Sequence, residues 1–282
     1  MELESLQFHL EHACVSGLGF GVEERTLLYS SLVVVQSEYR FHRVLLWGKV
    51  LGLVHDYYIA LGLGPERLKK KKILFSTNGV DWHLLSPVPE SLLESAANLQ
   101  GRFQGNPSHE YQPPVVNNAA EDEEVKIKEE IRLAVVVAAI DEEVALAPRG
   151  AFIKTPIGQV IKNRSFEGLT IEEGVKLRSY MHLRELKLPS TMSLLQKSKL
   201  DPSIDFLDSI EKDFPKGCWS LQIEQGGRFA VLRSLHWIGL TFYHEMLAPN
   251  HGYAYIGFGE KNLDIAFMLS GSSTGCHVLA PQ

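Results

Sequence analysis

Cysteine is scarce in the 282-residue sequence, which contains only Cys14, Cys218 and Cys276 and no Cys-x-x-Cys pair. This spacing indicates neither a disulfide framework nor a zinc site of a familiar type, so we expect reduced thiols in a cytosolic compartment. No run of about eighteen apolar residues is present, and a membrane-spanning helix is therefore not predicted. The acidic, histidine-containing start of the chain also lacks the basic and apolar segments of a signal peptide.

Sequence patterns of known catalytic sites are also lacking. The glycine-rich segment 17–21 does not follow a predicted strand, as a dinucleotide-binding loop would, and segment 257–261 lacks the ending of a phosphate-binding loop. Neither a His-Glu-x-x-His nor a Gly-x-Ser-x-Gly motif occurs. The sequence therefore predicts no catalytic residue, metal ligand or cofactor. The alternative hypothesis is a small-molecule-binding or enzymatic domain that uses the 257–261 turn with His236, His244 and Lys261.

The excess of negative charge is small, with a formal net charge of -6. A mildly acidic chain has no general affinity for nucleic acid and weakly favours basic partners. One basic run stands out at residues 67–72. Such a run is usually a solvated loop, so neither nucleic acid nor a membrane is the predicted partner. Contact of this run with a membrane or a microtubule surface is a further alternative, which salt dependence would test.

The composition, 45% hydrophobic and 22% charged, is typical of a globular protein with a sizeable core. Residues 105–124 are rich in Asn, Pro and acidic residues and are predicted to be a loop or linker. This segment divides an N-terminal α+β half, 1–104, from a C-terminal α+β half, 125–269, and we expect the halves to pack as one unit. Residues 270–282 are predicted to be a disordered tail.

Apolar periodicity and turn residues predict an α+β fold in which several helices pack on antiparallel sheet. Asn78-Gly79 between two apolar runs is a strong hairpin signal, and Thr170 with Glu173 forms a capping box at the start of a helix. The predicted elements are helices over 23–38, 89–99, 125–143, 170–186 and 201–214, strands over 43–53 and 55–63, a hairpin over 73–85, and a four-stranded meander over 218–259.

Aromatic residues are concentrated in this C-terminal meander. Most of them are expected to fill the layer between the sheet and the helices. Tyrosine and tryptophan are also favoured at protein interfaces, because they combine a large apolar area with a polar group. A partner interface is therefore predicted in the meander at Trp237, Phe242, Tyr243, Tyr253, Tyr255 and Phe258.

Several long stretches of the chain resemble the radial spoke head protein 9 family, and together they extend from about residue 5 to residue 269. These stretches are VLLWGKVLGLVHDYYIALGL (44–63), GRFQGNPSHEYQ (101–112), ALAPRGAFIKTPIG (145–158), NRSFEGL (163–169), LDPSIDFLDSIEKDFPKGCWSLQ (200–222), LRSLHWIGLTFYH (232–244) and YAYIGFGEKN (253–262). The sequence departs from the family at Ile238, where proline is expected between Trp237 and Gly239.

The resemblance implies a non-catalytic structural subunit of the radial spoke head, located in the cytoskeleton of motile cilia and flagella, in the axoneme. It implies assembly with radial spoke head proteins of the four and six types and with other spoke head subunits. Through the assembled head, it implies contact with the central-pair apparatus and regulation of dynein-driven bending. No enzymatic activity and no cofactor accompany the family.

Overall fold

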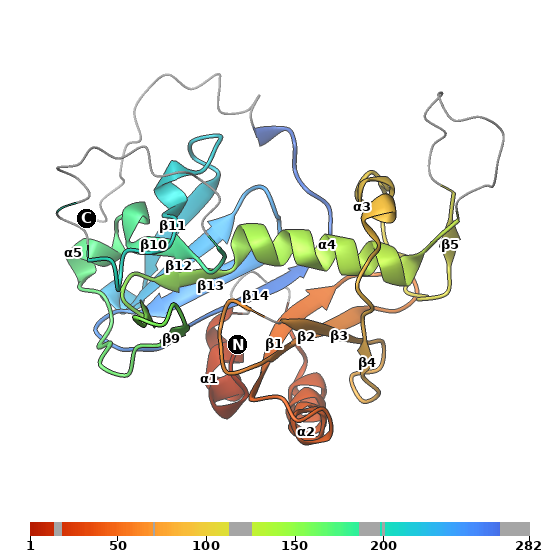
Figure 1. Ribbon diagram of the computed structural model, residues 1–282, viewed down its shortest axis with the longest axis horizontal. Coiled ribbons are helices and arrows are strands. Elements are labelled where there is room, and N and C mark those ends of the chain that lie inside the picture. Colours follow the sequence, from red (N-terminus) through yellow and green to blue (C-terminus); the bar gives the residue numbers. More distant parts are fainter. Residues whose placement is uncertain (14–18, 70, 113–125, 186–197, 199–200, 266–282) are drawn as a thin grey trace.

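The computed structural model describes residues 1–13, 19–69, 71–112, 126–185, 198 and 201–265. Its centre is one eight-stranded sheet in the order β11-β12-β13-β14-β1-β2-β3-β4 (Figure 1). Every neighbouring pair is antiparallel except β1 and β14, which are parallel, so the sheet is mixed. The strands are β1 (Arg43–Val50), β2 (Tyr57–Leu63), β3 (Lys72–Ser76), β4 (His83–Leu84), β11 (Trp219–Glu224), β12 (Phe229–Ser234), β13 (Leu240–Glu245) and β14 (His251–Gly257).

The parallel contact between β1 and β14 joins strands from the two halves of the chain in one sheet. The two strands come close together because Gly48 of β1 lies opposite Tyr255 of β14, next to a shift in register after Leu46. Gly48 has a φ of 150°, and a Cβ atom at this position would lie 1.9 Å from the carbonyl oxygen of Tyr255. Only glycine therefore allows this approach.

Helices α1 (Leu6–Ala13) and α2 (Val22–Glu38) cover one face of the sheet (Figure 1). Leu28, Leu32 and Val35 of α2 recur at helical spacing and are buried in the same cluster as alternate residues of β1, such as Leu46. Trp82, which follows the β3–β4 turn, closes this layer and donates from Nε1 to Ser31 Oγ at 3.1 Å. The helix predicted over 23–38 and the hairpin predicted over 73–85 are confirmed.

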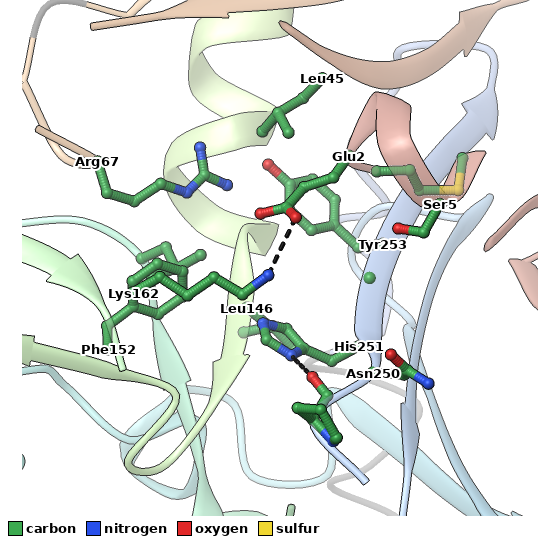
Figure 2. A pocket seen from close by; sticks show the side chains of 14 residues that line it. Glu2, Ser5, Leu45, Arg67, Leu146, Phe152, Lys162, Asn250, His251 and Tyr253 are labelled. Atoms are coloured by element: carbon green, nitrogen blue, oxygen red, sulfur yellow. Dashed lines mark hydrogen bonds and ion pairs between the residues drawn. The ribbon is translucent and has the colours of Figure 1, made fainter. Parts of the chain in front are cut away.

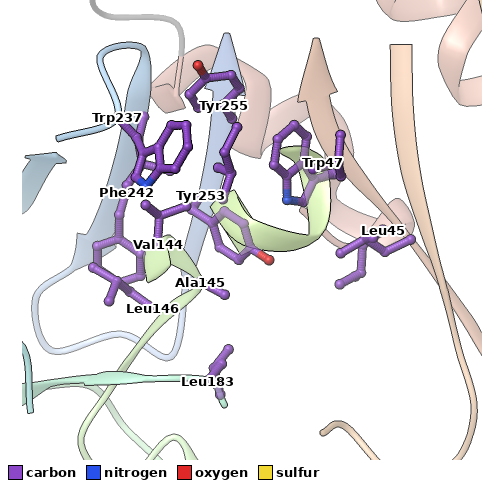
Figure 3. Close-up of a cluster of buried hydrophobic side chains, with 14 of the residues drawn as sticks. Leu45, Trp47, Val144, Ala145, Leu146, Leu183, Trp237, Phe242, Tyr253 and Tyr255 are labelled. Atoms are coloured by element: carbon purple, nitrogen blue, oxygen red, sulfur yellow. The ribbon is translucent and has the colours of Figure 1, made fainter. Parts of the chain in front are cut away.

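Helix α4 (Glu129–Val144) covers the opposite face of the sheet (Figure 1). Most of its residues are buried, and Leu133, Val137 and Ile140 pack in the larger hydrophobic cluster. Figure 3 shows the end of this helix among Trp47, Tyr253 and other large side chains of the sheet. The prediction of a deeply buried helix is confirmed, and so are the α+β class and the four-stranded meander.

Short elements complete the described fold at the ends of α4 and along the edge of the sheet. Three two-stranded sheets form between β5 (Glu110–Tyr111) and β6 (Ile127–Lys128), β7 (Leu146–Pro148) and β10 (Tyr180–His182), and β8 (Phe152–Lys154) and β9 (Val160–Lys162). The remaining helical elements are α3 (Glu90–Ala97), α5 (Ile171–Gly174) and the 3-10 turns Leu3–Ser5, Leu177–Ser179, Ile210–Lys212 and Gln225–Gly227.

The helix predicted over 170–186 is wrong beyond its first turn. Thr170 caps α5 as expected, and its hydroxyl accepts a hydrogen bond from the amide of Glu173 at 3.3 Å. The helix ends at Gly174, whose carbonyl accepts a hydrogen bond from the Tyr180 hydroxyl, and the chain then pairs as β10 with β7. Tertiary pairing overrides the helical periodicity here because the extended conformation buries Tyr180 in the core, where it is 0% exposed.

The helix predicted over 201–214 is also wrong, since only the 3-10 turn at 210–212 is helical. The Asp201 side chain accepts hydrogen bonds from the amide and hydroxyl of Ser203, which forms a local turn instead of a helix cap. Ser209 then pairs with Met181 of β10 as an extended bridge. Of the predicted linker, residues 113–124 lie outside the described residues, as does the predicted tail 270–282. The boundaries of the two halves stay a prediction.

Candidate interaction surfaces

The structure places five of the six predicted interface residues in the core of the sheet. Trp237, Phe242, Tyr243, Tyr253 and Tyr255 are all at most 6% exposed. Phe258 is 42% exposed, and the guanidinium carbon of Arg102 lies 4.4 Å from the centre of its ring. The interface assignment stays a prediction for the six residues, and Phe258 is the one whose ring the structure leaves accessible.

A buried carboxylate explains why the tyrosine at 253 is held in the core. Asp141 of α4 accepts hydrogen bonds from the Tyr253 hydroxyl at 2.8 Å and from Trp47 Nε1 at 3.2 Å, and it pairs with Lys71 Nζ at 2.8 Å. Burial raises the pKa of Asp141, but the charge and hydrogen bond of Lys71 outweigh it, so the net pKa is lowered. An ionised Asp141 therefore fixes both aromatic side chains between α4 and the sheet.

The alternative site at His236, His244 and Lys261 is not assembled in one place. His236 and Lys261 line a cavity of about 180 Å³ together with Glu143. The Glu143 carboxylate is bonded there to Lys261 Nζ and to the indole nitrogen of Trp237, both at 2.7 Å. His244 does not line this cavity. It is fully buried, where its Nε2 accepts from the Leu169 amide at 3.1 Å.

The groups next to this cavity do not supply a nucleophile or a phosphate loop. Cys218 lines the cavity, but burial and the Asp213 charge raise the pKa of its thiol to about 11, so it is protonated at neutral pH. In the 257–261 turn, the amide of Gly259 donates to the Tyr255 hydroxyl at 2.9 Å and is not available to a phosphate. Across the part of the chain that the structure describes, no group of three or more His, Cys, Asp or Glu residues could hold a metal ion.

An apolar surface on α2 is not predicted by the sequence patterns. Besides its buried stripe, α2 exposes large apolar side chains on its outer side, which we call the α2 surface: Val22, Leu27, Tyr29, Val33 and Val34. The hydroxyls of Thr26 and Ser30 donate to backbone carbonyls one turn earlier in the helix, so these residues add little polarity. The absence of any charged residue between Thr26 and Ser37 is the sequence signal that could have revealed this surface.

The described residues of the basic run, 67–69 and 71–72, do not form one surface. Lys71 pairs with the buried Asp141, and Lys69 pairs with Glu66. Arg67 turns toward a small cavity of about 70 Å³, which Lys162 and Glu2 also line (Figure 2). The dispersal of these side chains is evidence against a single flat contact with a membrane or a microtubule. Among the described residues, no helix is long and apolar enough to cross a membrane.

The fold and these surfaces define an α+β protein whose mixed sheet is buried on both faces and whose outer helix exposes an apolar side. No family model matches the chain. Three curated relatives, each called radial spoke head protein 9 homolog, align over 276 residues, which is 95% of this chain and all of the relative: the cow protein at 49% identity, the human protein at 48% and the mouse protein at 49%. The chain therefore belongs to the radial spoke head protein 9 family, as the sequence motifs predict.

Proposed function

We propose that this protein is a non-catalytic structural subunit of the radial spoke head in the axoneme of motile cilia and flagella. The observation that carries the proposal is the identity of 48–49% over nearly the whole chain to proteins named for the radial spoke head. In this role the protein assembles with spoke head proteins of the four and six types. The assembled head faces the central-pair apparatus and contributes to the regulation of dynein-driven bending.

The α2 surface supports a role in assembly. Val22 is 81% exposed and Val34 is 61% exposed, although exposed valine on a helix contributes nothing to the stability of the monomer. Several exposed apolar side chains on one helix of a folded protein are typical of protein interfaces. A helix of this length is roughly 25 Å long, so its outer face offers a few hundred Å2 at most. A stable pair of proteins buries about 1,200 Å2 or more in total. The α2 surface therefore suits a subunit that is held in a larger assembly by several contacts.

A rescue experiment tests the proposed function. The protein would be expressed in ciliated cells that lack their own member of the family, and spoke heads on the axoneme would be examined by electron tomography together with the beat of the cilia. We expect restored spoke heads and co-purification of the spoke head proteins of the four and six types. Folded protein that enters the cilium but restores no spoke head would contradict the proposal.

Two matched variants separate assembly from folding. Val33→Lys places a charge on the α2 surface, whereas Ile157→Lys places the same charge on a residue that is 86% exposed in the β8–β9 turn. Neither side chain is buried, so both variants are expected to fold with unchanged thermal stability. We expect Val33→Lys to reduce co-purification of spoke head proteins about tenfold or more. An equal reduction of co-purification in both variants would exclude the α2 surface as the contact with spoke head proteins.

A further inference from the structure

A second cavity beside the one in Figure 2 is lined by basic side chains from three separate segments. This basic cleft has a volume of about 250 Å³, and its cationic side chains are Arg43 at the start of β1, Arg67 after β2, Lys162 of β9 and the following Arg164. His42 also lines it, and the described residues that line it include no aspartate or glutamate. A concentration of positive charge in a concave site is unexpected in a chain with a net charge of -6.

The positive charge of the basic cleft is only partly neutralised by the rest of the protein. Glu2 pairs with Arg43 at 3.3 Å and with Lys162 at 3.0 Å, and Figure 2 shows its carboxylate next to Lys162. Arg67 and Arg164 form no ion pair within 4 Å in the described ranges, although Arg67 hydrogen-bonds the Tyr253 hydroxyl and its charge helps to lower the pKa of Asp141. One terminal nitrogen of Arg67 is buried without a hydrogen-bond acceptor. Such a buried donor favours an added acceptor at this position.

The internal Glu2 contact shows which chemistry the basic cleft accepts. Burial raises the pKa of the Glu2 carboxyl, but Lys162 and Arg43 outweigh burial, so the net pKa is lowered. The same cations can therefore hold a second carboxylate, and the planar guanidinium of Arg67 is suited to a bidentate contact with one.

The walls of the cleft favour a polypeptide over a simple anion. Pro65 and Ile161, which are exposed, also line the cleft and provide apolar contact for the stem of an acidic side chain or for its neighbours. The aromatic ring of Phe152 is buried and is not presented for stacking with a nucleic-acid base. The concave shape also disfavours a flat lipid surface.

We propose that the basic cleft binds an acidic segment of a partner protein, with one carboxylate between Arg67 and Arg164 and neighbouring carboxylates near Arg43 and Lys162. The contact is electrostatic and partly desolvated, so it weakens with salt but is not abolished by it. This proposal does not depend on the assignment to the spoke head, because it is based only on the residues that line the basic cleft of this chain.

Binding of a fluorescent peptide of alternating glycine and glutamate, measured by anisotropy on the full chain, tests this proposal. We expect saturable binding that is absent for the matched peptide with glutamine in place of glutamate. Arg164→Gln, at an exposed position, should weaken binding about tenfold. Glu2→Gln should strengthen binding several-fold, because it frees Arg43 and Lys162 from their internal carboxylate.

Lys72→Gln is the matched control, since Lys72 belongs to the basic run 67–72 but does not line the cleft. We expect less than about a twofold change in peptide affinity for this variant. An equal loss for Arg164→Gln and Lys72→Gln would overturn the proposal, because binding would then follow net charge alone. Weaker binding by Glu2→Gln, with unchanged thermal stability, would also overturn it. Binding of inorganic phosphate or of phosphatidylserine vesicles without binding of the acidic peptide would assign the cleft to another anion.

Discussion

Acidification should destabilise this protein through the buried His244. The imidazole is fully buried, its Nε2 accepts from the Leu169 amide at 3.1 Å, and its Nδ1 lies 3.2 Å from the Asn250 carbonyl oxygen, to which it donates in the neutral form. Burial lowers the pKa of His244 to about 3, and the nearby His251 contributes in the same direction. The ordinary pKa of histidine, which applies in the unfolded chain, is about 6.5.

The sign and size of the effect follow from this difference in pKa. Below pH about 6.5 the unfolded chain binds a proton that the folded protein does not bind, so the free energy of unfolding falls as the pH falls, until the folded pKa of about 3 is reached. Between pH about 7.5 and about 5, the titration of His244 alone should lower the free energy of unfolding by about 2 kcal/mol, which lowers the Tm by roughly 4–8 °C. Burial also lowers the pKa of the partly exposed His251, to about 4. The free energy of unfolding of the whole protein should therefore fall somewhat more than His244 alone predicts.

Urea unfolding, followed by tryptophan fluorescence at several pH values, measures this loss. The window above pH about 5 avoids most of the carboxylates, whose ordinary pKa lies near 4. His244→Gln keeps an acceptor for the Leu169 amide but does not titrate. We expect this variant to be less stable than the natural protein at pH about 7.5. On acidification, its free energy of unfolding should fall by about 2 kcal/mol less than that of the natural protein. A variant with the same pH dependence as the natural protein would refute the argument.

Three further substitutions test the buried network and the close approach of strands. Asp141→Asn should lower the free energy of unfolding by about 3–5 kcal/mol in urea titrations, because Lys71 would be left without its buried partner; a loss below about 1 kcal/mol would contradict this reasoning. Glu129→Gln should cost about 2–3 kcal/mol by the same measurement, since the buried carboxylate accepts five hydrogen bonds. Gly48→Ala should cost about 3 kcal/mol or more and lower the thermal midpoint, because its Cβ would lie 1.9 Å from the Tyr255 carbonyl oxygen; a stable variant would refute the close approach.

Local sequence signals predicted the elements that local physics decides. The Asn78 side chain accepts hydrogen bonds from the amides of Val80 and Asp81, which fixes the β3–β4 turn within four residues. The helix over 23–38 follows from the spacing of Leu28, Leu32 and Val35, and the meander follows from alternation interrupted by glycine turns. These features need no knowledge of distant residues.

Segments whose conformation depends on distant partners were not predictable in the same way. The residues after Gly174 have a helical pattern, yet Tyr180–His182 forms a strand because β7 offers a partner 34 residues earlier in the chain, as in the pair of Met181 with Ala147. The burial of Tyr253 depends likewise on Asp141, 112 residues away. Alternation cannot separate core from surface in a sheet that helices cover on both faces.

The sequence by itself determined the α+β class, the strongest helices and turns, and the family, because these depend on local periodicity and on long motifs. Only the tertiary structure decided which surfaces are free. It buried five aromatic residues of the meander, exposed an apolar side of α2, and brought Arg43, Arg67 and Arg164 together in one cleft. Charge and apolar area act through space, so their functional grouping depends on contacts between segments that are far apart in the chain.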